Sequence, residues 1–126
     1  MARMDGLADL VAGDLRIELV ESAGVIRVEW KGKSNSREPA KILAHFFDEI
    51  VRRAASGKLG VEMHFETLEH FNSSTITALI QFIQTSRNRA VSLVSVYDSA
   101  LKWQRLSFDA LRIFEKSDGM LRFRAK

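Results

Sequence analysis

Cysteine is absent from this sequence of 126 residues, proline occurs once, and no apolar run approaches the roughly 20 residues that a membrane-spanning helix needs. Without cysteine the chain forms no disulfide and holds no thiolate nucleophile or zinc–thiolate site. The first residues carry Asp5, Asp9 and Asp14 within a short apolar stretch, a pattern unlike a signal peptide. Together these features predict a cytoplasmic protein that does not bind a membrane.

Motifs of the common enzyme classes are also absent, including glycine-rich nucleotide loops, H-E-x-x-H and G-x-S-x-G. The alternative of a small metal- or ligand-binding enzyme rests on His64, Glu66 and His70. Glu62 and Glu69 add carboxylates to this set, but the spacing matches no known metal-ligand pattern. We therefore predict that the chain is not an enzyme and holds no metal or cofactor.

The chain is mildly basic, with a formal net charge of +3 and an isoelectric point of about 9.5. A basic balance can indicate nucleic-acid binding. Here, however, the arginines and lysines are scattered along the sequence and interspersed with acidic residues. This pattern is typical of a solvated surface of mixed sign, and we expect no nucleic-acid partner.

Hydrophobic periodicity predicts the secondary structure. Alternating or strongly apolar stretches predict strands at 14–22, 25–31, 61–65 and 90–98, with a possible edge strand at 120–126. Apolar residues at helical spacing predict a helix that begins at Pro39, a second helix at about 73–88 and a third at about 99–111. Residues 1–13 are expected to be flexible or to form a short helix. All 126 residues are assigned to one domain.

The alternation of strands and helices implies parallel strand pairs and right-handed crossovers. Three of the strands also have a polar face, formed by Arg16 and Glu18, by Arg27 and Glu29, and by Glu62 and His64. A sheet covered by helices on both sides would not tolerate these faces. We therefore predict an α/β domain with a mixed sheet of about four to five strands, helices mainly on one face, and parallel neighbours at 61–65 and 91–97.

The third predicted helix has two apolar stripes. One stripe contains Trp103, Leu106, Ala110, Ile113 and Phe114, and the other, nearly opposite, contains Leu101, Phe108 and Leu111. A surface helix seldom needs two such stripes. Either the helix breaks near Phe108 and its phase resets, or one stripe binds a partner or a second copy of the chain.

Small polar residues, Asn72, Ser73, Ser74 and Thr75, stand where a strand region meets the second helix. One of them would suffice to cap the helix. Three consecutive hydroxyls exceed that need, and a helix N-terminus can also hold a phosphate through its free amides and dipole. From the residues themselves, both capping and phosphorylation remain open.

The segments VEMHF (61–65), LEHFNSST (68–75), ITALIQFIQTSRNRA (76–90) and VSLVSVYD (91–98) together resemble the STAS domain of anti-sigma factor antagonists. The resemblance covers the order of elements over about residues 14–115 and is specific around 68–83. It implies a non-enzymatic regulator that is phosphorylated at one hydroxyl by a kinase, often itself the anti-sigma factor, and dephosphorylated by a phosphatase. Partner choice then follows the phosphorylation state, which is known as partner switching.

In that family an Asp precedes the phosphoacceptor, and these positions fall on Asn72 and Ser73, with Ser74 and Thr75 as fallback acceptors. Asn in place of Asp, and Thr75 where many members have Gly, depart from the family pattern. The Asn form is also similar to a divergent STAS-like branch that activates diguanylate cyclases in biofilm signalling under a kinase and a phosphatase. The expected partner surface contains these four residues and the exposed side of the second helix, at Thr77, Gln81 and Gln84.

Overall fold

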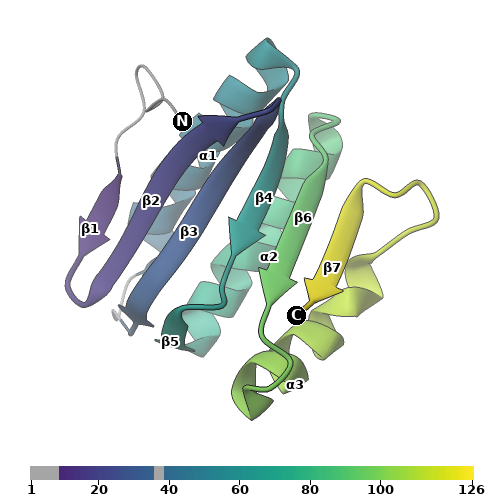
Figure 1. The fold of residues 1–126 in the computed structure, drawn as a ribbon. Coiled ribbons are helices and arrows are strands. Elements are labelled where there is room, and N and C mark those ends of the chain that lie inside the picture. Colours follow the sequence, from purple (N-terminus) through teal and green to yellow (C-terminus); the bar gives the residue numbers. More distant parts are fainter. Residues whose placement is uncertain (1–8, 36–38) are drawn as a thin grey trace.

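The computed structural model describes residues 9–35 and 39–126, which form one mixed sheet and three α-helices (Figure 1). The strands are β1 (Leu10–Ala12), β2 (Leu15–Ser22), β3 (Val25–Ser34), β4 (Gly60–His64), β5 (Leu68–Phe71), β6 (Leu93–Tyr97) and β7 (Leu121–Ala125). The helices are α1 (Pro39–Gly57), α2 (Ser73–Asn88) and α3 (Lys102–Leu111), and a 3₁₀ turn, η1 (Arg112–Phe114), follows α3.

The strand order across the sheet is β1-β2-β3-β4-β6-β7, and the short strand β5 pairs with the end of β3. β1, β2 and β3 are antiparallel neighbours, whereas β4, β6 and β7 continue the sheet parallel to β3. The predicted parallel pairing of the 61–65 and 91–97 strands is confirmed, with Val61 opposite Leu93. The predicted strand number is too low, because the short strands β1 and β5 carry too few residues for a clear periodic pattern.

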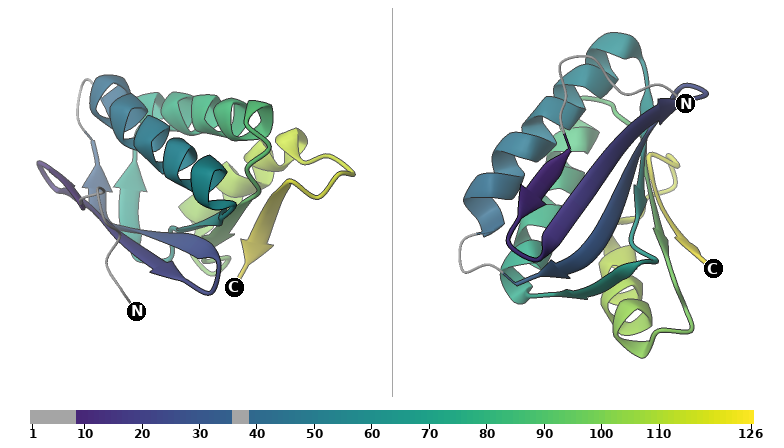
Figure 2. Two further views of the ribbon diagram at one scale, coloured as in Figure 1. Left: turned by 90° about the horizontal axis from the view of Figure 1, so that it is seen from above. Right: turned by 60° about the vertical axis from the view of Figure 1, so that its left-hand side comes forward.

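The helices lie on one face of the sheet, as Figure 2 shows in the view along the strands. One face of the long strands carries apolar side chains that point toward the helices and are buried, as with Ile17, Val28 and Met63. Side chains of the opposite face form ion pairs in solvent, such as Lys31 with Glu18 at 2.6 Å and Arg27 with Glu29 at 3.3 Å. The prediction of a one-sided α/β sheet is therefore confirmed.

Aromatic rings fill the centre of the core. Trp30 on β3 and Phe65 after β4 have ring centroids 5.1 Å apart, and Phe65 in turn lies 4.7 Å from Phe108 on α3. The ring of Phe108 also stacks on Tyr97 at 5.2 Å. These contacts join α3 to the central strands, so that α3 packs at the end of the sheet where β4 and β6 finish.

A glycine near the end of β3 lies close to the turn between β1 and β2. The φ angle of Gly32 is +81°, and a side chain at this position would collide with the carbonyl oxygen of Asp14. From Gly32, opposite Leu68, β3 pairs with β5, and the register of this pairing shifts between Gly32 and Lys33, which places Ser34 opposite Phe71. The pairing with β5 thus brings the end of β3 to the start of α2.

The outer edge of the sheet at β7 is partly covered by a side chain. The carbonyl of Met120 and the amide of Lys126 bond toward β6, so the amides of the odd-numbered residues between them face away from the sheet. One of these, the amide of Phe123, donates to the carboxylate of Glu115 at 3.2 Å.

Residues 1–8, which the sequence predicts to be flexible or helical together with 9–13, lie outside the described residues, whereas residues 10–12 form strand β1. Among the described helices, none has the length and apolar character needed to cross a membrane.

Candidate functional site

Asn72 caps α2. Its backbone is extended, and its side-chain oxygen accepts both the amide of Thr75 at 3.0 Å and the hydroxyl of Thr75 at 2.8 Å. The capping interpretation therefore holds for Asn72 and involves one of the three hydroxyls that follow it. Capping leaves the hydroxyls of Ser73 and Ser74 without an explanation.

Thr75 is fully buried, with 0% of its surface exposed. Its hydroxyl lies 2.7 Å from the hydroxyl of Ser34, and the amide of Asn72 donates to the carbonyl of Ser34 at 3.0 Å. These bonds fasten the first turn of α2 to the end of β3. As a fallback acceptor Thr75 is poorly placed, because a kinase would reach it only after this turn had opened.

Ser73 is exposed and Ser74 is half-buried. In the described part of the chain, the hydroxyl of Ser73 has no hydrogen-bond partner, and its carbonyl accepts the hydroxyl of Thr77 at 3.2 Å. The first amides of a helix have no partner within the helix, and they point toward this end. Of the three hydroxyls, that of Ser73 is the most accessible to a modifying enzyme.

The two serines face different neighbours. Residues spaced three and seven apart share one flank of a helix, so Ser73 lies in line with Ile76 and Ile80. Arg87, seven residues further, donates to the carbonyl of Phe114 at 3.1 Å, which shows that this flank faces η1 and α3. Ser74 lies on the other flank, which faces α1.

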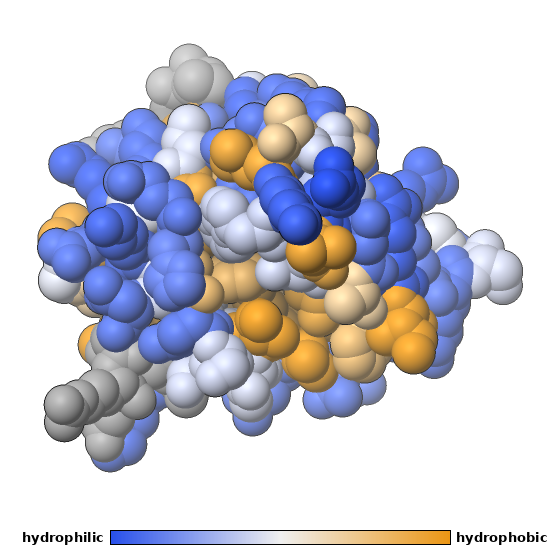
Figure 3. All heavy atoms as spheres, turned by 90° about the horizontal axis from the view of Figure 1, so that it is seen from below, coloured by the Kyte–Doolittle hydropathy of each residue, from blue (hydrophilic) through white to orange (hydrophobic). Residues whose placement is uncertain are grey.

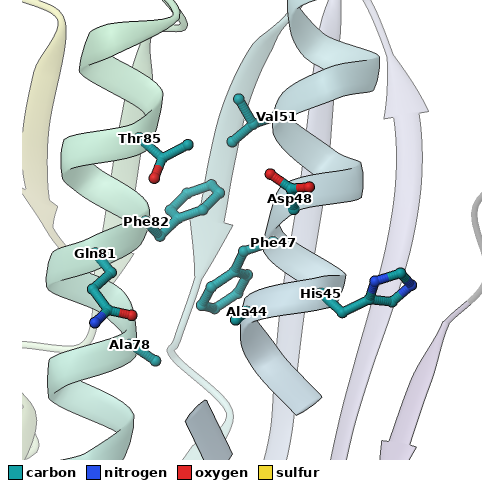
Figure 4. A pocket seen from close by; sticks show the side chains of 9 residues that line it. All are labelled: Ala44, His45, Phe47, Asp48, Val51, Ala78, Gln81, Phe82 and Thr85. Carbon is teal, nitrogen blue, oxygen red and sulfur yellow. The ribbon is translucent and has the colours of Figure 1, made fainter. Parts of the chain in front are cut away.

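An open groove of about 400 Å³ separates α1 from α2. Phe47 and Phe82 form its floor, with ring centroids 4.7 Å apart, and Asp48 and Gln81 stand at its rim (Figure 4). The side chain of His45, also at the rim, points away from α2 in this view. The open form and mixed lining of this groove suit contact with a protein segment better than enclosure of a small ligand.

The remaining residues of the expected partner surface lie on the outside of α2. Thr77, Gln81 and Gln84 are exposed, and Gln81 also lines the groove. Asn72 is half-buried, and Thr75 contributes no surface for a partner. The structure thus presents Ser73, Thr77 and Gln84 on one accessible side of the helix.

His64 lies on the open face of the sheet but is only 7% exposed, because two carboxylates enclose its ring. Its Nδ1 lies 2.9 Å from Glu66, and its Nε2 lies 2.5 Å from Glu62. Both ring nitrogens therefore lie within hydrogen-bond distance of a carboxylate, which makes the histidine part of a polar cluster rather than an isolated surface residue.

Lys126 extends this cluster through an ion pair with Glu66 at 2.8 Å. Burial raises the pKa of the Glu66 carboxyl, but the hydrogen bonds from Lys126 and His64 outweigh burial and hold this pKa below its ordinary value of 4.5. The Glu66 carboxylate is therefore stabilised in its charged form by the partners within this cluster.

The enzyme alternative requires His70 to join His64 and Glu66. His70 is exposed on β5, with its ring 6.4 Å from that of Trp103 on the helical side of the sheet, while His64 is on the open face. No group of three histidine, aspartate or glutamate side chains among residues 9–35 and 39–126 has an arrangement that would hold a metal ion. The structure does not bring these three residues together.

Two residues that support the junction escaped sequence analysis. Ser34 belongs to a polar loop region in the sequence, and only the β3–β5 pairing brings it to Thr75. Gln104 is a fully buried polar residue on α3 that donates to the carbonyl oxygens of Phe65 and Leu68 and accepts the amide of Asp98. Its position on the apolar side of a helix, between Leu101 and Phe108, is a signal that could have identified it.

α3 continues without a break through Phe108 to Leu111. Gln104, Phe108 and Leu111 face the core, so the two stripes belong to one helix and the predicted phase reset near Phe108 is wrong. In the other stripe Trp103 and Phe114 are half-buried against the core, whereas Leu106 and Ile113 face outward, 57% and 82% exposed.

No protein-family model matches the chain, and no curated protein is similar to it in sequence. Among solved structures, the fold is similar to that of the activator SiaC in the crystal structure of the diguanylate cyclase SiaD in complex with its activator SiaC from Pseudomonas aeruginosa. The two chains share 20% sequence identity with a TM-score of 0.65, and the alignment covers 94% of this chain and 99% of that one. This chain therefore shares its fold with that structure over nearly its whole length.

Proposed function

We propose that this chain activates a diguanylate cyclase by direct binding, and that phosphorylation of Ser73 controls the binding. One observation carries the proposal: the free, exposed hydroxyl of Ser73 opens a helix in a domain whose fold is that of a cyclase activator. A protein kinase adds the phosphate and a phosphatase removes it. The chain itself catalyses no reaction.

The position of Ser73 suits a switch that acts on binding and leaves the fold intact. A phosphate carries about −1.5 to −2 charges at neutral pH. At an exposed helix N-terminus such a charge is favourable by about 0.3–1 kcal/mol. Asn72 and Thr75 hold the helix start through buried bonds that do not involve the Ser73 hydroxyl. The added charge therefore changes the surface offered to the partner more than it changes the helix.

An anti-sigma factor antagonist would use the same switch, and the resemblance to the STAS domain makes it the second candidate. The similarity to SiaC favours the cyclase partner over the anti-sigma factor. Both functions rely on an unmodified Ser73 for contact with the target. They differ in the identity of the protein that the unmodified chain binds.

The two candidates are separated by capture and assay. The Ser73→Ala variant, purified from its own cells with bound proteins, should retain a diguanylate cyclase, and adding it to that cyclase should raise the formation of cyclic diguanylate. Ser73→Asp should stay folded and activate less. Ser92→Asp is the matched control, because Ser92 is exposed at the opposite end of the parallel strands, before β6.

Two outcomes would count against the proposal in different ways. Retention of an anti-sigma factor in place of a cyclase would support the antagonist function. If protein isolated from its own cells never carries phosphate on residues 72–77, and Ser73→Asp activates like the wild type, Ser73 is not a switch. Mass spectrometry and the cyclase assay report these two results independently.

A further inference from the structure

An apolar surface that joins half-buried side chains to exposed ones lies beside Ser73. The surface is formed by six residues of two helices, Ile76 and Ile80 on α2 and Trp103, Leu106, Ala110 and Ile113 on α3 and η1, and we call it the α2–α3 surface. Ser73 belongs to the same flank of α2 as its two isoleucines, and the ring of Trp103 packs on Phe71 at 5.1 Å. The surface therefore begins at the proposed phosphorylation site.

Apolar residues gather at this end of the molecule, where charged residues border them (Figure 3). Leu106 and Ile113 are too exposed to serve the core, which Phe108 and Leu111 already complete from the same helix. Large exposed apolar side chains in a contiguous patch mark contact sites.

The spacing of the α3 residues indicates the shape of the occupant. Trp103, Leu106, Ala110 and Ile113 follow one another at intervals of three, four and three residues. This is the spacing at which one helix packs along another, with apolar residues of the second helix between those of the first. The occupant is accordingly a helix with an apolar face.

The charges beside the stripe indicate the chemistry of the occupant. Lys102 and Arg105 are exposed, and neither forms an ion pair with another described residue. The carboxylate of Asp109 on the same helix is already engaged, since it accepts the hydroxyl of Tyr97 at 2.9 Å and lies 3.5 Å from Arg112. The two unpaired cations favour acidic side chains on the occupant.

The same charges disfavour two other occupants. A second copy of this chain would bring its own Lys102 and Arg105 toward like charges. A lipid surface would strip water from the Asp109 carboxylate, which lies between Leu106 and Ile113 along the helix and is exposed. A protein segment with carboxylates and hydrogen-bonding groups avoids both the repulsion between like charges and the desolvation of Asp109.

We infer that the α2–α3 surface docks an acidic amphipathic helix of the partner protein. The inference rests on the proposed function in that the partner is a protein whose binding Ser73 controls. A phosphate on Ser73 would stand at one end of the surface and repel the carboxylates of the docked helix. This identifies the negative charge of the partner as the reason why modification weakens binding.

The first test locates the contact in living cells. A photo-crosslinking amino acid replaces Leu106 in the full chain, and a matched chain carries it at Val11, which is 68% exposed on β1. Leu106 should crosslink to one protein segment in which apolar residues at helical spacing alternate with aspartate and glutamate, and Val11 should not. A crosslink to this chain itself, to lipid or to a segment without carboxylates, or no crosslink at all, would overturn the inference.

The second test measures affinity with a synthetic peptide of the mapped segment. Leu106→Glu should weaken binding about tenfold or more, as expected for loss of a central apolar anchor. Lys102→Glu/Arg105→Glu should weaken binding, and a peptide with lysine in place of its carboxylates should restore it. Lys58→Glu/Arg122→Glu is the matched control, because both cations are exposed elsewhere and it should bind like the wild type. Equal binding by all variants would overturn the inference.

A membrane is tested with phosphatidylglycerol vesicles, with which the wild-type chain should not sediment. Sedimentation that Leu106→Glu abolishes would assign the surface to lipid and overturn the inference.

The results also separate this inference from the proposed function. If the mapped acidic helix belongs to a protein other than a cyclase, the proposed cyclase activation is wrong and the docking inference stands. If a cyclase crosslinks to a probe at Gln81 but not to one at Leu106, the proposed cyclase activation stands and the docking inference is wrong.

Discussion

The hydroxyls of Ser34 and Thr75 are buried and lie 2.7 Å apart. This hydrogen bond joins the end of β3 to the first turn of α2. Thr75→Val keeps the shape of the side chain but removes the hydroxyl that bonds to the hydroxyl of Ser34 and to the side-chain oxygen of Asn72. We expect the free energy of unfolding to fall by about 1–3 kcal/mol, the cost of unpaired buried polar groups. Urea denaturation measures the loss. Thr77→Val, at an exposed threonine two residues on, should change stability by less than about 0.5 kcal/mol; an equal loss would refute the role of the bond.

Asn72 as the cap of α2 gives a second prediction. Asn72→Ala removes the acceptor of both the amide and the hydroxyl of Thr75 and should cost about 0.5–2 kcal/mol. Asn72→Asp keeps the acceptor and adds a negative charge that the helix dipole favours, so it should not destabilise the protein. Thermal unfolding of the two variants beside the wild type tests this order. A stable Asn72→Ala variant would show that the cap is dispensable.

Gln104 gives a third prediction, because it satisfies three backbone groups in a buried position. Gln104→Leu would remove the donor to the carbonyls of Phe65 and Leu68 and the acceptor of the Asp98 amide, and of these the Phe65 carbonyl keeps a bond from the amide of Leu68. The loss should be at least about 2 kcal/mol, since each buried unpaired group costs about 1–3 kcal/mol. Gln84→Leu, at an exposed position of α2, is the control and should be nearly neutral. Hydrogen exchange should show faster exchange of the Asp98 amide in Gln104→Leu and no change there in the control.

The two histidines of the enzyme alternative should respond differently to substitution. His64→Ala leaves Glu62 and Glu66 facing each other without the ring between them and should cost about 1–3 kcal/mol. His70→Ala removes an exposed side chain and should change stability by less than about 0.5 kcal/mol. Chemical denaturation of the two variants makes the comparison. Equal small effects would mean that the carboxylate–histidine cluster does not form in solution.

The lowered pKa of Glu66 predicts how stability depends on pH. A carboxyl whose pKa is lower in the folded than in the unfolded state stabilises the fold above the unfolded value, near 4.5, and this contribution is lost as the pH falls through the folded value. Glu66→Gln should therefore be less stable than the wild type at pH 7, and the difference should shrink on acidification below about pH 4.5. Denaturation midpoints at pH 7, 5 and 3 would test the sign; a difference that grows toward pH 3 would contradict it.

Sequence periodicity predicts the long elements of this fold because each carries a complete apolar pattern. The alternation in β2, the stripe of α1 and the run after Asn72 are long enough to fix both the type and the direction of the element. The polar faces of three strands were sufficient to predict the open side of the sheet. The exposed Ser73 and the capping Asn72 also follow from the local order of residues.

The parts that sequence analysis missed depend on contacts between distant residues. β5 has four residues, and its pairing with β3 shifts register after Gly32. His64 was predicted as a surface residue because it alternates with core residues on β4, yet the flanking Glu62 and Glu66 bury it. Periodicity assigns a side chain to a face but does not show what covers that face.

The carboxylate of Glu115 accepts a hydrogen bond from the amide of Phe123, on the free edge of the sheet. A sheet whose open face already lies in water, and whose last strand ends in unsatisfied amides, offers a template on which a further strand of another molecule can assemble. By accepting that amide, and by adding a charge next to it, Glu115 interrupts the row of donors that such assembly requires. Glu115 thus lowers the tendency of this sheet to associate edge to edge with another molecule.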